Sequence, residues 1–182
     1  GTNPADYADN KFAVQVRNSN DFMISHLKLD GRIKAECYSH GGIFVQNCDS
    51  FSIFDVEVVD FSYCGIWLTM AANASIYNTK LLNCAMPSEK SCTGCIMVGD
   101  VTDCSIHDCY IREDRGAYGI KGWRYSWTTH QPHIIEAGRD FYNDVVRLKI
   151  YNNDIKVRQT GAWGAGQPNM GIELWNCDAI DC

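Results

Sequence analysis

A short pattern recurs along this chain at irregular intervals, and it restricts the possible folds more than any other feature of the sequence. The copies are alternating runs at 42–47, 65–69, 95–99, 119–123 and 171–176, with a weaker copy at 12–17. Alternation of apolar and polar residues over so few positions is typical of a half-buried β-strand. Because the pattern keeps its internal phase while the intervals between copies change, it indicates stacked and equivalent coils.

Three apolar columns follow from this phase, one for each strand of a coil. The first strand is anchored by Val14, Ile43, Ile66, Ile96, Ile120 and Ile172, and the second by Ile24, Ile53, Ile76, Ile106 and Ile150. The third is anchored by Leu27 and Leu29, Val56 and Val58, Leu81, Cys109 and Ile111, and Ile155. Between the second and third strands stand His26, Asp55, Asn78, Asp108 and Asn152. Asn and Asp tolerate left-handed backbone, so this last column predicts a tight turn.

This organisation resembles the right-handed parallel β-helix of the pectate-lyase type. We therefore predict an all-β, right-handed, single-stranded parallel β-helix solenoid of about five to six coils, whose stacking buries side chains that one coil cannot bury alone. The domain is expected to span 1–182, with a leading segment at 1–11 and a loop insertion at 122–143. Because the sequence stops part-way through a coil at Cys182, we interpret it as a piece of a longer helix.

The composition argues against two kinds of partner. The chain has 182 residues and a formal net charge of −6, with a pI near 5.2, whereas nucleic-acid binding favours a basic surface. No apolar run approaches the roughly 20 residues that a membrane-spanning helix needs. We expect neither nucleic acid nor a membrane span.

The ten cysteines are many for a chain of this length. Disulfides that tie loops in an oxidising compartment and small thiols that fill the core are both compatible with this count. We favour a location outside the cytosol, extracellular or at the cell surface, and we include disulfides among the expected features.

Two columns of the first strand are expected to face solvent, because alternation directs the anchors inward. One reads Gln15, Phe44, Trp67, Met97, Lys121 and Glu173, and the next reads Arg17, Gln46, Thr69, Gly99, Trp123 and Trp175. Exposed aromatic side chains beside hydrogen-bonding groups suit the apolar faces and hydroxyl rims of sugars. We predict a substrate-binding groove formed by Phe44, Trp67, Trp123, Trp175, Gln46 and Arg17. The alternative is that the long loops cover these aromatics as a second hydrophobic cluster.

Candidate catalytic residues gather at the end of this groove. Lys121 and Glu173 occupy equivalent positions on adjacent rungs, where side chains come into contact. Asp114 precedes the strand of Lys121, and Arg124 opens the insertion. The competing interpretation of the Lys121–Glu173 pair is an exposed salt bridge. We expect no metal-ligand set, and we expect His107 to join a stacked ladder rather than to act in catalysis.

The resemblance implies a class of activity. Proteins with this fold are mostly extracellular enzymes acting on polysaccharides, such as lyases, glycosidases and epimerases, with substrate along the first-strand groove. It allows a calcium cofactor, although no other cofactor is evident. A lyase needs a base and a cation beside the uronate carboxylate, whereas a glycosidase needs two carboxylates across the bond. The sequence carries none of the specific catalytic signatures of these enzymes, so no catalytic residue is transferred.

We predict a secreted carbohydrate-active protein that binds a polysaccharide, with a lyase or glycoside hydrolase as the favoured enzyme. The alternative function is a non-catalytic structural or adhesive solenoid, such as an adhesin, a tailspike-like protein or a fibre subunit. In either case, the ends of the coil stack offer a route to self-association.

Overall fold

A computed structural model of the chain describes residues 12–32, 41–85, 94–115, 118–123, 145–158, 171–175 and 177–178. For Trp123, Glu173, Trp175, Cys177 and Asp178 the description covers the main chain alone. The expected leading segment at 1–11 and nearly all of the expected insertion at 122–143 lie outside these residues.

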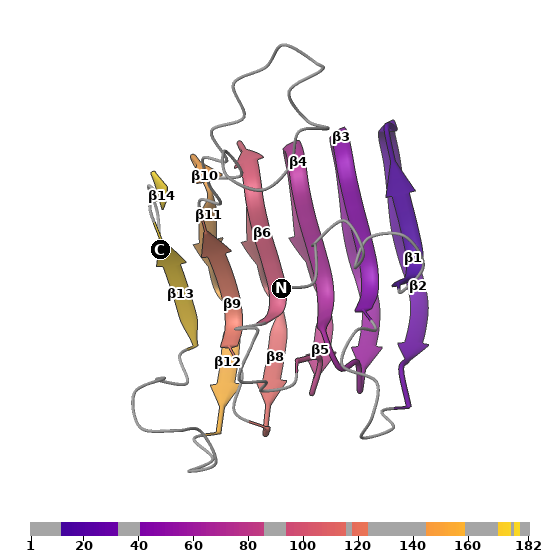
Figure 1. Cartoon of the computed structure of the whole chain (residues 1–182), viewed down its shortest axis with the longest axis vertical. Coiled ribbons are helices and arrows are strands. Elements are labelled where there is room, and N and C mark those ends of the chain that lie inside the picture. The colour runs from indigo at the N-terminus through magenta and orange to yellow at the C-terminus, as the bar shows by residue number, and fades with distance from the viewer. Residues whose placement is uncertain are drawn as a thin grey trace, which may run out of the picture.

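The described chain is built from parallel strands. They are β1 (Phe12–Arg17), β2 (Asn20–Asp30), β3 (Gly41–Val59), β4 (Cys64–Tyr77), β5 (Lys80–Leu82), β6 (Gly94–Thr102), β7 (Ser105–His107), β8 (Tyr110–Glu113), β9 (Tyr118–Trp123), β10 (Val145–Val146), β11 (Lys149–Tyr151), β12 (Asp154–Val157), β13 (Ile172–Trp175) and β14 (Cys177–Asp178). Figure 1 shows the first strands of successive coils side by side, from β1 through β3, β4, β6 and β9 to β13. The described residues contain no helix that is long and apolar enough to cross a membrane.

The register between coils is the one that the anchors predict. On the first strand, Ile43 pairs with Val14 and with Ile66, and the column continues through Ile96, Ile120 and Ile172. On the second strand the column runs Ile24, Ile53, Ile76, Ile106 and Ile150. On the third it runs Leu29, Val58, Leu81, Ile111 and Ile155. The predicted parallel β-helix is confirmed.

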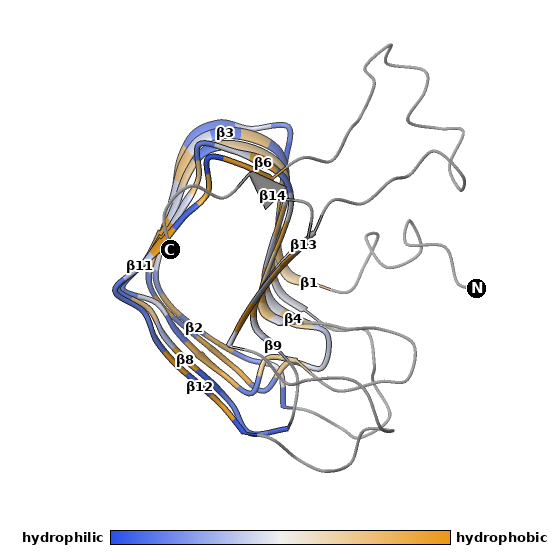
Figure 2. Ribbon diagram, turned by 90° about the vertical axis from the view of Figure 1, so that its left-hand side faces the viewer, coloured by the Kyte–Doolittle hydropathy of each residue, from blue (hydrophilic) through white to orange (hydrophobic). Residues whose placement is uncertain are grey.

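These columns form one continuous apolar core. Figure 2, which looks along the stack, shows successive coils superimposed around a single interior. The central anchors Ile43, Ile66 and Ile96 are fully buried, whereas Ile172 on the last rung is 38% exposed. A rung therefore gains its burial from the neighbours above and below it, as the stacking argument requires.

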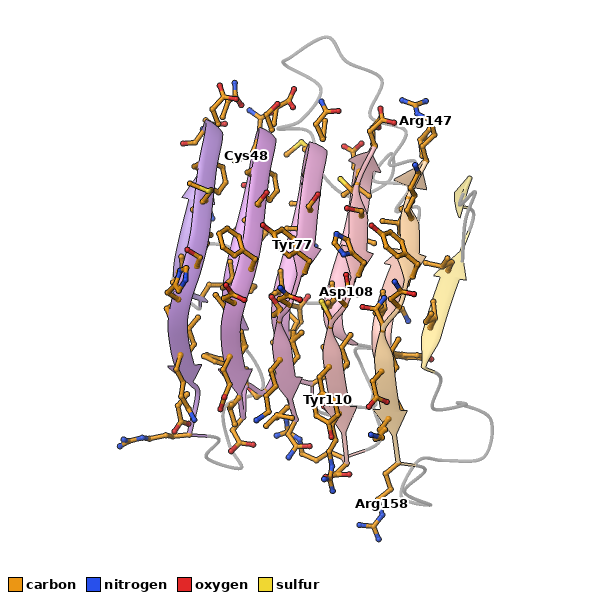
Figure 3. All side chains as sticks on the ribbon, turned by 180° about the vertical axis from the view of Figure 1, so that it is seen from behind. Cys48, Tyr77, Asp108, Tyr110, Arg147 and Arg158 are labelled. Atoms are coloured by element: carbon orange, nitrogen blue, oxygen red, sulfur yellow. The ribbon has the colours of Figure 1, made fainter. Side chains whose placement is uncertain are left out.

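The predicted turn column is confirmed as a line of left-handed residues. His26, Asp55, Asn78, Asp108 and Asn152 all have positive φ, between 47° and 56°. The residues just before this turn form the predicted ladder on the outer face of the second strand, where Tyr77 is visible in Figure 3. Ring centroids are 5.0 Å apart for Phe54 and Tyr77, 5.3 Å for Tyr77 and His107, and 4.7 Å for His107 and Tyr151. His107 is thus enclosed in a structural stack.

Most of the described cysteines lie at turns, and among the described residues no disulfide is present. Cys48, Cys64, Cys84, Cys95, Cys104 and Cys109 are free and buried, so the expected disulfides are not found in this part of the chain. Cys48, Cys84, Cys104 and Cys109 each follow a left-handed Asn or Asp.

Each of these four thiols lies near two backbone carbonyls. One carbonyl is two residues earlier, 3.2–3.4 Å away, and the other is on the preceding coil, 3.0–3.9 Å away. Burial raises the pKa of the Cys104 and Cys109 thiols to about 11, so they remain protonated donors at neutral pH. The Thr79 and Ser19 hydroxyls, which follow the left-handed Asn78 and Asn18, each donate to the carbonyl two residues earlier. Four of the six described buried cysteines are therefore small buried donors at coil corners.

A glycine begins the first strand of most coils because the corner leaves no room for a side chain. A Cβ at Gly65 would lie 2.6 Å from Leu81 Cδ2 and 2.8 Å from the Cys95 carbonyl oxygen. At Gly171, on the last rung, the nearest atom is Ile155 Cγ2 at an ordinary 3.5 Å.

We predict that Gly65→Ala lowers the free energy of unfolding by about 2 kcal/mol, because the added methyl group overpacks a backbone contact. The matched substitution Gly171→Ala should change it by less than about 0.5 kcal/mol. Urea denaturation followed by circular dichroism measures both. Equal losses in the two variants would contradict the steric explanation.

Candidate functional site

The outer face of the first strand carries the two predicted columns in register. Phe44 pairs with Gln15 and with Trp67, and the column continues through Met97, Lys121 and Glu173. In the second column Gln46 pairs with Arg17 and with Thr69, and Trp123 pairs with Trp175. The prediction of which backbone positions share this face is therefore confirmed across six rungs.

The aromatic residues of the first rungs are packed rather than open to solvent. Phe44 is 1% exposed and Trp67 is 8% exposed, and they form a cluster with Phe12, Cys64 and Met97 that is separate from the core of the coil. In this structure Phe44 and Trp67 thus form the covered cluster that was the alternative to an open groove. Their assignment to substrate binding stays a prediction.

Phe12, which no sequence pattern singled out, packs over the other rings of this cluster. The Phe12 ring stacks on Phe44 with centroids 5.0 Å apart, and it lies 6.1 Å from the Trp67 ring. Phe12 pairs with Gly41 on the next rung, and a side chain at Gly41 would overlap its ring. The small residue at position 41 thus makes room for a large neighbour. Phe12 has the same phase as the inward Val14, so alternation alone would place its side chain inside the coil, whereas it lies in the outer cluster.

Two polar residues of the predicted groove flank this cluster. The Arg17 guanidinium lies 5.4 Å from the centre of the Phe44 ring, within the range of a cation–π contact. Gln46, on the next rung, is half-buried. Both stay on the rim of the outer face, where a ligand bound to that face would meet them.

The Lys121–Glu173 pair lies on the last two described rungs of this face. The two residues are direct register partners in β9 and β13, and Trp123 and Trp175 are partners two positions further along. Lys121 Nζ lies 4.3 Å from the centre of the Tyr118 ring, and Tyr118 itself is buried. The side chains of Glu173, Trp123 and Trp175 lie outside the description, as does the whole of Arg124.

Asp114 is engaged on the third-strand corner. Its carboxylate accepts a hydrogen bond from Arg112 Nε at 2.8 Å, and its backbone N–H donates to Asn83 Oδ1 at 3.0 Å. The described contacts of the Asp114 carboxylate are thus with the third strand and not with the Lys121–Glu173 pair.

A neighbouring carboxylate, Glu113, is fully buried. It accepts hydrogen bonds from Ala85 N at 3.0 Å, from Arg115 N at 2.8 Å and from Arg115 Nε at 3.4 Å, and the Cys95 thiol lies 3.6 Å away. Arg115 also donates to the Phe61 carbonyl at 3.1 Å, so this pair joins the corners of several coils. The signal was present in the sequence, because Glu113 continues the inward phase of Cys109 and Ile111.

Burial is the main cause that raises the pKa of Glu113, and the contacts with Arg115 and Ala85 only partly oppose it. Its neighbours are the buried thiol of Cys95 and the corner turns at Ala85 and Arg115. Glu113 therefore holds the end of β8 in place from inside the coil. It faces the interior and not the outer surface.

A calcium ion, which the resemblance allows, stays an expectation from the sequence. Among the described residues, no group of three or more His, Cys, Asp or Glu side chains is placed to hold a metal ion. No chemical step is derived through such an ion.

We predict that Glu113→Gln alters how stability depends on pH. Because the folded-state pKa of Glu113 is raised, folding takes up a proton between the unfolded and folded pKa values. Through this group, wild-type stability falls as the pH rises from about 4.3, the usual pKa of glutamate, through the folded-state pKa. The variant lacks this loss, so its stability relative to wild type should rise over that range.

The matched control is Glu57→Gln. Hydrogen bonding to Lys28 lowers the pKa of Glu57. The stability of this variant relative to wild type should therefore fall as the pH rises, and this change should occur below the usual pKa of glutamate. Urea denaturation at a series of pH values separates the two. A pH-independent difference between wild type and Glu113→Gln would show that the buried carboxyl has an ordinary pKa.

The comparisons with known proteins bear on the fold. No family model and no curated protein sequence matches the chain. Among solved structures, the chain is similar to crystal structures of two variants of the periplasmic alginate epimerase AlgG, one with a single substitution and one with two. Each comparison has a TM-score of 0.61 and 12% sequence identity, and it covers 92% of this chain but 36% of the epimerase chain. The chain therefore spans well under half the length of these epimerase chains, and the likeness establishes a right-handed parallel β-helix.

Proposed function

We propose that this chain is a carbohydrate-active β-helix protein that binds a polysaccharide along the outer face of its first strands and modifies it at the Lys121–Glu173 end. The observation that carries the proposal is the direct register between Lys121 and Glu173, with Trp123 and Trp175 paired beside them. The similarity to a periplasmic alginate epimerase supports a polysaccharide as partner and a location outside the cytosol.

The residue types at this end suit reactions that begin with removal of a proton beside a carboxylate. A lyase or an epimerase needs one group to take that proton and a cation to stabilise the charge that develops on the carboxylate. A lysine and a glutamate on adjacent rungs supply one basic and one cationic partner. A glycosidase would instead need a second carboxylate, and that of Asp114 is bonded to Arg112. The contact of Asp114 with Arg112 argues against Asp114 as that second carboxylate, and this supports proton abstraction as the proposed chemistry.

A non-catalytic solenoid is the second candidate, and the packing of the first rungs favours it. Phe12, Phe44 and Trp67 contact one another instead of presenting open ring faces, and Lys121 rests on Tyr118. Such contacts are those of a stable surface. Under this alternative, self-association through the coil ends would build a fibre or stalk.

We predict that Glu173→Gln lowers activity by about a hundredfold or more, which is the usual contribution of a general acid or base. Alginate, polygalacturonate and neutral glucans are incubated with the protein. Unsaturated products are followed by ultraviolet absorbance, epimerised residues by proton NMR and new reducing ends by colorimetry. Lys121→Gln should cause a loss of similar size.

The control is Glu57→Gln, which removes the same charge from the third-strand face, where Glu57 pairs with Lys28 at 2.6 Å. It should retain wild-type activity. If Glu173→Gln is as active as wild type, Glu173 takes no part in the chemistry. If wild type binds a polysaccharide without changing it, the non-catalytic candidate is the correct one.

A further inference from the structure

One polar atom in the aromatic cluster has no hydrogen-bond partner. Trp67 is 8% exposed, and its Nε1–H, fully enclosed, finds no acceptor among the residues that the structure describes. A buried donor without an acceptor loses its hydration and gains nothing in return. Such groups are rare in native proteins, and each calls for an explanation such as a ligand that completes the bond.

The Phe12 side chain, on the first described coil, packs over the other aromatic rings of the cluster. Phe12 stands at the start of β1, on the first described coil, and its ring contacts the rings of Phe44, Trp67 and Tyr63. The backbone of β1 is held by its own pairing with β3. Phe12 is itself 8% exposed, so opening the cluster requires its ring to turn away from Phe44 and Trp67, and the pairing of β1 with β3 can persist while it does so.

The uncovered surface would have the features of a sugar subsite. It would present two aromatic rings whose centroids are 5.1 Å apart, the Nε1–H of Trp67 as a donor, and Gln46 and Arg17 on its rim. Aromatic faces contact the apolar faces of sugars, and the indole N–H can donate to a sugar hydroxyl or carboxylate oxygen.

We propose that the Phe12–Phe44–Trp67 cluster is the closed form of a glycan subsite, with Phe12 as its cover and a sugar oxygen as the missing acceptor for Trp67 Nε1. This inference rests on the proposed function. It adds an anchoring position away from the reacting end, since Trp67 lies two rungs before Lys121 in the same column, about 10 Å along the stack.

A closed subsite lowers the apparent affinity in proportion to the time that the cover is in place. The observed dissociation constant equals the intrinsic one divided by the fraction of open molecules. Removing the cover therefore tightens binding, although it removes packing from the free protein. A merely structural Phe12 would show the loss of stability without any gain in affinity.

The test compares two phenylalanines of the first coil. Phe12→Ala should tighten binding about tenfold, because the stacking that holds the cover closed is lost. Phe22→Ala is the matched control. The Phe22 ring also stacks on the next rung, 4.8 Å from Phe51, but this pair packs against the core of the coil, so its affinity should equal that of wild type. Binding of a mannuronate hexasaccharide and of cellohexaose is measured by isothermal titration calorimetry.

A further variant tests whether the gain in affinity depends on the N–H of Trp67. In the Phe12→Ala background, Trp67→Phe keeps an aromatic ring but removes the N–H, and it should weaken binding about fivefold. If Phe12→Ala does not fold, Phe12→Leu should tighten binding about threefold, because a smaller contact is lost.

The outcomes separate the subsite from the proposed function. Tighter binding by the Phe12 variant and not by the Phe22 variant supports the closed subsite. Equal binding by wild type and both variants overturns the subsite and leaves the proposed function standing. Absence of binding of either probe by every variant overturns the binding proposal and the subsite with it.

Discussion

The parallel register of one isoleucine upon another is the constraint on which the rest of this structure depends. Ile43, Ile66 and Ile96 are fully buried only because each lies between equivalents on the neighbouring rungs. A slip of one residue would turn every anchor outward and every outward residue into the core. The positions of Lys121 and Glu173 on one face are therefore a consequence of the core and need no contact of their own.

Corners are the second requirement, because a coil must change direction without leaving polar backbone groups unpaired. The chain meets it with a left-handed Asn or Asp followed by a small donor, as at Asn83–Cys84 and Asp108–Cys109. A thiol suits this place since it is compact and apolar enough to be buried, yet it can donate to a carbonyl. The same chemistry explains why these cysteines remain unpaired with one another.

The sequence was sufficient for the fold because its anchors repeat at fixed positions within each coil. Ile53 and Ile76 could be placed by counting, and the register of Lys121 with Glu173 followed from the same count. The burial of Phe44 and Trp67 could not be predicted in this way. It depends on Phe12 lying over Gly41, which is a contact between side chains of different size and not a periodic property. Glu113 was predictable in position, whereas its partners Ala85, Arg115 and Cys95 were not.

Residues on the inner and outer faces of the coil are therefore constrained in different ways by their neighbours. An inward residue must match the rung above and the rung below, so its choice is limited to apolar side chains of similar shape, and polar exceptions such as Glu113 need several donors. An outward residue is held only by its immediate neighbours, so its burial can depend on one side chain, as that of Phe44 and Trp67 depends on Phe12. Within such a face, a phenylalanine at position 67 would fill the cluster without an unpaired donor, whereas the indole at this position leaves one. The free energy lost on that unpaired N–H is regained only when an acceptor arrives, which is the physical reason to connect this cluster with a ligand rather than with stability.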